Sequence, residues 1–177
     1  MKKLLAILLA ALLVFSLVAC GGASDNQTTA PDASGETAEG TGSTGNDVVK
    51  IGVFEPQSGD NGAGGKQEIL GMQYANYVAP TVEIGGKTYD VKLEIVDNES
   101  STDKAPTAAQ TLVSAGISVA LGSYGSSVAI AGSPVFQNAG IPAIGVTCTN
   151  PQVTEGNSHY FRICFLDPFQ GTVPANY

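Results

Sequence analysis

The sequence is poor in positive charge. It has eight lysines and arginines against 16 aspartates and glutamates, which gives a formal net charge of −8. Proteins neutralise the phosphates of nucleic acid with lysine and arginine, so an acidic chain is a poor match for that surface. Nucleic acid is therefore not an expected partner.

Histidine and cysteine are also scarce. The only histidine is His159, and the cysteines Cys20, Cys148 and Cys164 form neither a Cys-x-x-Cys pair nor a Cys/His cluster. This spacing excludes a zinc site and a thioredoxin-like redox motif. Two interpretations of Cys148 and Cys164 remain open. We favour two small buried hydrophobic residues over a disulfide formed in an oxidising compartment.

Catalytic motifs are missing as well. No serine lies in a G-x-S-x-G elbow, no nucleophile is suitably spaced from His159, and the glycines of residues 59–65 match neither G-x-G-x-x-G nor a P-loop. Asp97, Glu99 and Asp103 are interpreted as a solvated acidic surface, which we favour over a metal or acid-base role. We expect a protein that is not an enzyme and that uses no cofactor or metal.

The amino terminus has the pattern of an export signal. Two lysines precede an apolar run over residues 4–19, which is too short for a helix that crosses the hydrocarbon core of a bilayer. Residues 17–20 (LVAC) resemble the bacterial lipobox, in which the cysteine sulfur receives diacylglycerol. We expect residues 1–19 to be a lipoprotein signal peptide and Cys20 to be the lipidated residue. Acyl chains on Cys20 would anchor the protein to the outer face of the cytoplasmic membrane.

Residues 20–47 follow as the lipidated cysteine and a linker. From residue 21 onward this segment is rich in Gly, Ser, Thr, Ala, Asp and Glu and has no aromatic residue to bury. Such a composition cannot offset the entropy that folding costs, so we expect a disordered tether.

Strand-like and helix-like segments alternate from residue 48 onward. Short β-branched runs predict strands, and apolar residues at helical spacing predict helices. The alternation predicts an α/β fold with a doubly wound, mainly parallel sheet. The expected strands are residues 48–54, 89–96, 117–121, 141–146 and 160–165. The expected helices are residues 66–78, 102–115 with Thr102 as a possible cap, and one that leads from the 122–127 turn to residue 138.

Three polar loops follow strands of this sheet. They are residues 56–65, 122–127 and 147–151, and ligands of such sheets bind at the carboxyl ends of the strands. The second loop places serines before a helix, where free N–H groups and the helix dipole favour a carboxylate. Ser126 or Ser127 could instead only cap that helix. The third loop could receive an ammonium group, although a plain polar turn is the favoured interpretation of that loop alone.

These segments resemble the amino-terminal lobe of the branched-chain amino-acid binding proteins, the type I solute-binding components of ABC importers. The resemblance runs from about residue 48 to the end, and four segments carry it. They are residues 51–59 (IGVFEPQSG), 122–127 (GSYGSS), 140–151 (GIPAIGVTCTNP) and 162–171 (RICFLDPFQG).

The resemblance implies a domain organisation. Residues 48–166 would form the amino-terminal ligand-binding lobe, and residues 167–177 would begin a truncated crossover to a second lobe. We therefore expect a monomeric fragment that lacks half of the usual cleft, so that lobe closure is lost and ligand binding is weak or absent.

The resemblance also implies a ligand site. The side chain and N–H of Ser126 and the N–H of Thr149 would bind the ligand carboxylate, and the Thr147 carbonyl and Thr149 hydroxyl would bind its ammonium. This chain departs from the family in one respect. The family often has an aromatic residue near the position of Gly64, against the ligand's side chain, and this chain has none there. The other members of the expected site are Ser127, Tyr124 and Cys148.

The expected function is capture of a small amino acid, of the branched-chain type, for import by ABC permease subunits. Two alternatives remain open within the same fold: a tethered extracellular sensor, and a binder of amides, urea or aromatic acids. A hydrolase is the third candidate, and it lacks an activated nucleophile.

Overall fold

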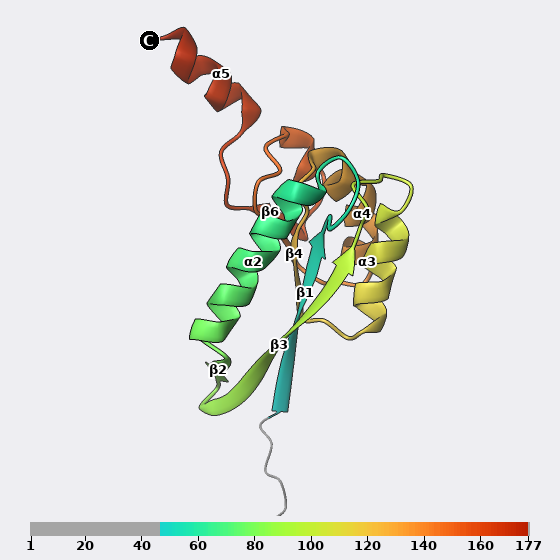
Figure 1. Ribbon diagram of the computed structural model, residues 1–177, viewed down its shortest axis with the longest axis vertical. Helices are drawn as coiled ribbons and strands as arrows, with labels where there is room; N and C mark the ends of the chain where they lie inside the picture. The colour runs from blue at the N-terminus through green and yellow to red at the C-terminus, as the bar shows by residue number, and fades with distance from the viewer. Residues whose placement is uncertain (1–46, 177) are drawn as a thin grey trace, which may run out of the picture. The chain divides into compact units, whose positions relative to one another are not determined.

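The computed structural model describes residues 47–176, which form a six-stranded sheet flanked by helices (Figure 1). The strand order is β2-β3-β1-β4-β5-β6. β2 and β3 pair antiparallel, and every other neighbouring pair is parallel. The strands are β1 (Asp47–Glu55), β2 (Thr81–Ile84), β3 (Lys87–Asp97), β4 (Val119–Gly122), β5 (Ala143–Gly145) and β6 (Tyr160–Arg162).

The helices connect the parallel strands. α2 joins β1 to the β2–β3 hairpin and lies on one side of the sheet, whereas α3 and α4 pack against each other on the other side (Figure 1). This arrangement confirms the predicted doubly wound α/β sheet. The helical elements are α2 (Gly62–Val78), α3 (Ala105–Ser114), α4 (Ser126–Asn138), the 3-10 turn η1 (Pro151–Val153) and α5 (Asp167–Ala175).

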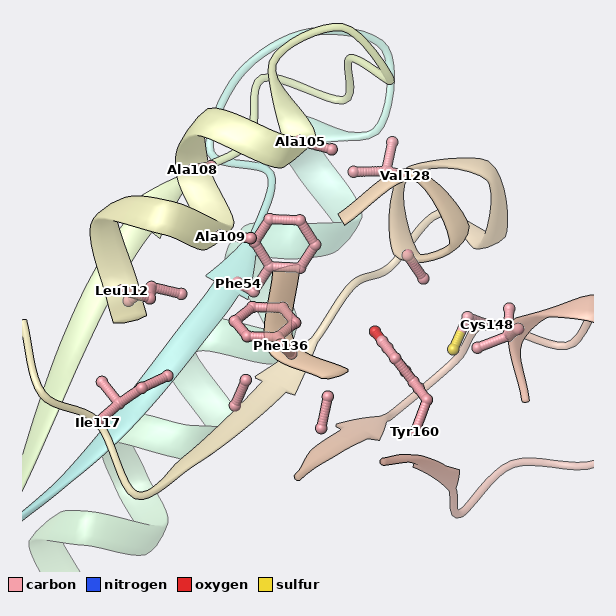
Figure 2. Packing of buried hydrophobic residues seen from close by; sticks show 14 residues of the cluster. Phe54, Ala105, Ala108, Ala109, Leu112, Ile117, Val128, Phe136, Cys148 and Tyr160 are labelled. Carbon is pink, nitrogen blue, oxygen red and sulfur yellow. The ribbon is translucent and has the colours of Figure 1, made fainter. Parts of the chain in front are cut away.

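The main hydrophobic cluster lies between the sheet and the α3–α4 layer (Figure 2). Phe54 of β1 meets Phe136 of α4 edge to face, with ring centroids 5.4 Å apart. Small residues such as Ala105 and Ala109 let α3 approach these rings closely. Burial of large aromatic rings dominates core energetics, so this cluster fixes β1 against α4. It thereby also fixes the loops that follow β1 and β4.

α2 begins at Gly62, four residues before the predicted start at residue 66. Glycine disfavours helix, which is why these residues were assigned to a loop. The structure shows why glycine is needed: a Cβ on Gly65 would lie 2.1 Å from the carbonyl oxygen of Pro56. Close packing of α2 on the preceding loop therefore overrides helix propensity.

Other boundaries also differ from the prediction. Residues 84–87 form a turn in which Gly85 and Gly86 have positive φ, and the strand before this turn, β2, is not among the predicted strands. α3 begins at Ala105, and Ser101 rather than Thr102 accepts the Lys104 N–H at 3.3 Å. α5 was also not predicted, and none of its residues is buried.

The expected signal peptide, Cys20 and nearly all of the linker lie outside the described residues. Within residues 47–176, no helix combines the length and the apolar character that crossing a bilayer requires.

Candidate functional site

The loops after β4 and β5 meet at the carboxyl edge of the sheet. The Ser126 hydroxyl oxygen, at the start of α4, accepts a hydrogen bond from the Asn150 N–H at 3.3 Å. Ser126, Thr149 and Asn150 are all half-buried. Ser126 and Thr149 thus lie on neighbouring loops at one rim, neither sealed in the core nor on opposite sides of the molecule.

Ser126 does not cap its own helix. The N-cap position of α4 is Gly125, and no side chain caps that terminus. Because the Ser126 oxygen accepts from Asn150, its hydroxyl hydrogen can still be donated to another group. The first N–H groups of a helix have no partner within the helix, so this terminus presents donors toward the rim. Ser127, the next residue, is exposed.

Thr147 links the third loop to two other elements. Its hydroxyl donates to Glu68 of α2 at 2.5 Å and lies 3.4 Å from the carbonyl oxygen of Tyr124. Thr147 itself is exposed at the rim. The second and third loops therefore adjoin a carboxyl group from α2, which no motif in the sequence marks as part of the site.

Tyr124 occupies the space beside Gly64. A Cβ on Gly64 would lie 2.5 Å from the Cε2 and Cζ atoms of the Tyr124 ring, so the ring rests against the helix backbone. The ring is 38% exposed. An aromatic surface is thus present next to position 64, although it comes from the loop after β4.

Cys148 does not present its side chain to the rim. It is fully buried in the main cluster (Figure 2). This burial, and to a smaller extent the nearby Cys164 thiol, raises the pKa of the Cys148 thiol to about 11. Only backbone groups of Cys148 remain for a ligand, because its thiol packs as a small hydrophobe. Both cysteines are free thiols here, with Cys164 half-buried.

Arg162 holds the third loop in shape. Its guanidinium donates to the carbonyl oxygens of Cys148 at 3.2 Å, Asn150 at 2.8 Å and Pro151 at 3.0 Å, and to the Thr154 hydroxyl at 2.9 Å. A planar guanidinium can satisfy several acceptors at once in a fixed geometry. No motif marks Arg162 for this role, because three of its four acceptors are backbone carbonyl oxygens.

Asp97 is an organising residue rather than part of a solvated surface. Its carboxylate accepts the Gln57 N–H and the Glu99 N–H, each at 2.8 Å, and the Ser58 hydroxyl at 2.7 Å. Partial burial raises the pKa of Asp97, but these hydrogen bonds outweigh it and the net pKa is lowered. Glu99 and Asp103 are exposed, as predicted.

Asn98, which no motif in the sequence marks, links β1 to the second loop. The side chain is fully buried and its amide donates to the Phe54 carbonyl oxygen at 3.1 Å and to the Ser123 hydroxyl at 3.0 Å. An asparagine just after a strand is a common turn residue, so its sequence position alone did not distinguish it.

Glu55 lies beneath the rim at the end of β1. It is fully buried, and one carboxyl oxygen accepts the Tyr124 N–H at 2.7 Å. Burial, followed by the neighbouring Glu68 carboxyl group, raises the pKa of Glu55 to about 10. By contrast, His159 lies at the amino-terminal edge of the sheet, where its carbonyl accepts the Ala143 N–H.

Comparisons with known proteins identify relatives of this chain. The sequence profile of a family described as periplasmic binding protein matches residues 48–172. An amino acid binding protein of Pseudomonas aeruginosa is 38% identical over 135 residues, covering 74% of this chain and 35% of that protein. A Leu/Ile/Val-binding protein homologue of Brucella abortus is 32% identical over 131 residues, covering 73% and 35%.

Solved structures show the same fold. The leucine binding protein LivK of Thermotoga maritima has a TM-score of 0.66 and 33% identity, over 72% of this chain and 35% of that one. LivJ of Streptococcus pneumoniae, solved with isoleucine, also has a TM-score of 0.66, with 30% identity over 74% of this chain and 38% of that one. The chain thus spans about a third of the length of these relatives.

Proposed function

We propose that this chain, which belongs to the periplasmic binding protein family, is the ligand-capturing part of an ABC importer for a small amino acid of the branched-chain type. The observation that carries the proposal is the hydrogen bond between Ser126 and Asn150, which puts the start of α4 beside Thr149 at one rim. Neutral groups at this rim can bind both ends of a zwitterion.

The ligand carboxylate would bind at the start of α4. The Ser126 hydroxyl and N–H and the Thr149 N–H are the proposed donors, and Ser127 adds a second hydroxyl beside them. A helix N-terminus attracts negative charge through its free N–H groups and its dipole. Hydrogen bonds to an ionised acceptor are roughly twice as strong as neutral ones, so no arginine is required.

The ligand ammonium would bind on the third loop. The Thr147 carbonyl oxygen and the Thr149 hydroxyl are the proposed acceptors. The Glu68 carboxyl group bonded to the Thr147 hydroxyl supports this assignment, because a negative charge next to the site favours a cationic group. Cys148 would contribute through its backbone alone.

The ligand side chain would lie against the Tyr124 ring. This ring rests on Gly64 and is part exposed at the rim. An aliphatic side chain gains free energy when it covers an aromatic face, because both surfaces leave water. Tyr124 would thereby take the place of the aromatic residue that position 64 lacks.

The location and partners of the protein are part of the same proposal. Its homologues are periplasmic binding proteins of transporters, which work outside the cytoplasm. We place this protein on the outer face of the cytoplasmic membrane, anchored through a lipidated Cys20 and delivering ligand to permease subunits as a monomer. Mass spectrometry of the membrane fraction would show diacylglycerol on Cys20, and Cys20→Ala should release the protein.

Binding is tested by titrating L-leucine into the full chain while backbone amide signals are followed by NMR, which detects weak binding. The amides of Ser126, Ser127 and Thr149 should shift together and saturate. Ser126→Ala should weaken the affinity by about 1.5–3 kcal/mol, about ten-fold or more, as expected for a hydrogen bond to a charged group.

Ser118→Ala is the matched control. Ser118 is exposed just before β4, at the opposite edge of the sheet, so its removal should leave leucine binding unchanged. A folded wild-type chain whose rim amides respond to other amino acids but not to leucine would refute the proposed ligand. Equal affinities in Ser126→Ala and the wild type would remove Ser126 from the site.

A further inference from the structure

Two glutamates beneath the rim each have a buried oxygen with no hydrogen-bond partner. Glu55 ends β1 and is fully buried, and Glu68 lies in α2. If both side chains were ionised, Oε1 of Glu55 and Oε2 of Glu68 would have no hydrogen-bond donor. A buried unpaired acceptor costs free energy, and two facing carboxylates also repel each other.

The other two carboxyl oxygens already have donors. Oε2 of Glu55 accepts the Tyr124 N–H at 2.7 Å, and Oε1 of Glu68 accepts the Thr147 hydroxyl at 2.5 Å. The Glu55 and Glu68 carboxyl groups lie within hydrogen-bonding reach of each other. The two unpaired oxygens can therefore be the inner members of a chain of contacts that runs from the second loop to the third. A single missing hydrogen would satisfy both of them.

We propose that Glu55 and Glu68 share one proton, carried on Oε1 of Glu55 and donated to Oε2 of Glu68. The pair then holds one negative charge, which stays on Glu68 beside Thr147. Glu55 is the protonated member because it is the more deeply buried of the two.

The surroundings of Glu55 favour its neutral form. The titratable groups that interact with it are Glu68 of α2, Cys148 of the third loop and Tyr160 of β6, none of them cationic. Gly122 lies on its remaining side, where a Cβ would be 2.6 Å from Oε1 of Glu55. Burial without a counter-ion raises the pKa of a carboxyl group, here to about 10.

The shared proton links the parts of the proposed ligand site. One continuous path leads from the Tyr124 N–H through Glu55 and Glu68 to the Thr147 hydroxyl, and so joins β1, α2 and the loops after β4 and β5. Glu55 and Glu68 are thus positioning residues, and their importance for ligand capture rests on the proposed function. The proton itself is a property of the fold.

Glu55→Gln separates the proton from the hydrogen bonds. The amide oxygen of glutamine can accept the Tyr124 N–H, and its NH2 group can donate to Glu68, so the path survives without a titratable proton. Infrared spectra of the wild-type chain at neutral pH should show the C=O stretch of a protonated carboxylic acid. This band should be absent in Glu55→Gln and retained in Glu83→Gln, a control at an exposed glutamate of β2.

Hydrogen exchange of the Tyr124 amide tests the positioning role. Its protection should be retained in Glu55→Gln and should fall about ten-fold or more in Glu55→Ala. If Glu55→Ala does not fold, the shared proton is tested by how the thermal stability of Glu55→Gln depends on pH. A group whose pKa is raised by folding makes the folded state lose stability as pH rises above the unfolded pKa.

The thermal midpoint of the wild type should therefore fall relative to that of Glu55→Gln between about pH 5 and about pH 9. Parallel midpoint curves, or no carboxylic acid band in the wild type, would overturn the shared proton. None of these measurements needs a ligand. A chain that shows the band, and whose rim amides respond to other amino acids but not to leucine, would leave the proton in place and refute only the proposed ligand.

Discussion

The ring of Tyr124 lies against the backbone of Gly64, where a Cβ would come within 2.5 Å of two ring carbons. The two residues belong to different elements, the loop after β4 and the helix α2. Their contact is possible only because position 64 has no side chain. The aromatic surface of the rim therefore depends on a glycine that makes no contribution to helix stability.

Gly64→Ala should displace the Tyr124 ring and destabilise the protein by about 1–3 kcal/mol, the usual cost of overpacking. Urea denaturation measures the change. Gly71→Ala in the same helix is the matched control, because a Cβ there meets nothing within 4 Å. That variant should be stabilised by up to about 1 kcal/mol through helix propensity. Stabilisation of similar size in both variants would show that the Tyr124 ring moves away freely.

Asn98→Ala should lower the free energy of unfolding by about 2–4 kcal/mol. The change leaves the Phe54 carbonyl oxygen and the Ser123 hydroxyl without their buried donor, and such orphaned groups cost about 1–3 kcal/mol each. Asn138→Ala at the exposed end of α4 should change stability by less than about 0.5 kcal/mol. Equal effects of the two changes would mean that water replaces the Asn98 amide.

Asp97→Asn should make the protein less stable at neutral pH and less sensitive to acid. Folding lowers the pKa of Asp97, so its stabilisation is present above the unfolded pKa and is lost as pH falls through the folded pKa. The stability difference between wild type and Asp97→Asn should thus shrink from about pH 7 to about pH 2. Asp103→Asn, at an exposed position, should give a curve parallel to that of the wild type.

Arg162→Lys should loosen the third loop even though the charge is kept. A lysine ammonium has only three N–H donors and lacks the guanidinium fork, so it cannot satisfy all four acceptors, and we expect a loss of about 1–3 kcal/mol in stability. The backbone amides of residues 148–154 should exchange faster with solvent, while those of β1 keep their protection. Unchanged exchange in the 148–154 loop would show that its own turns are enough to hold it.

The sequence predicted the architecture well, because alternating strand and helix patterns are local signals. The loops after β1, β4 and β5 were also located correctly, since parallel strands place their carboxyl ends at one edge. Helix α2 was shortened because the glycines at its start oppose helix formation by propensity. Only the close approach of Gly65 to Pro56 shows why they are there.

The supporting residues of the site could not be predicted from the sequence. Glu55, Glu68 and Asn98 bond to groups on other loops and strands that lie 25 to 79 residues away, and no spacing along the chain indicates such contacts. Cys148 was expected at the ligand because it lies between Thr147 and Thr149, but its side chain turns into the core between two residues that do not. Roles assigned to Ser126, Thr147 and Thr149 stay predictions until a ligand is titrated.

The pairing of β1 has a consequence for how the chain folds during synthesis. β1 is the first strand of the sheet, yet its partners begin at Tyr89 on one side and at Val119 on the other. By contrast, the β2–β3, β4–β5 and β5–β6 pairs each join strands that follow one another along the chain. A chain that is released from the ribosome before residue 119 is added would therefore leave at least one edge of its central apolar strand β1 unpaired. Such a form is prone to aggregate.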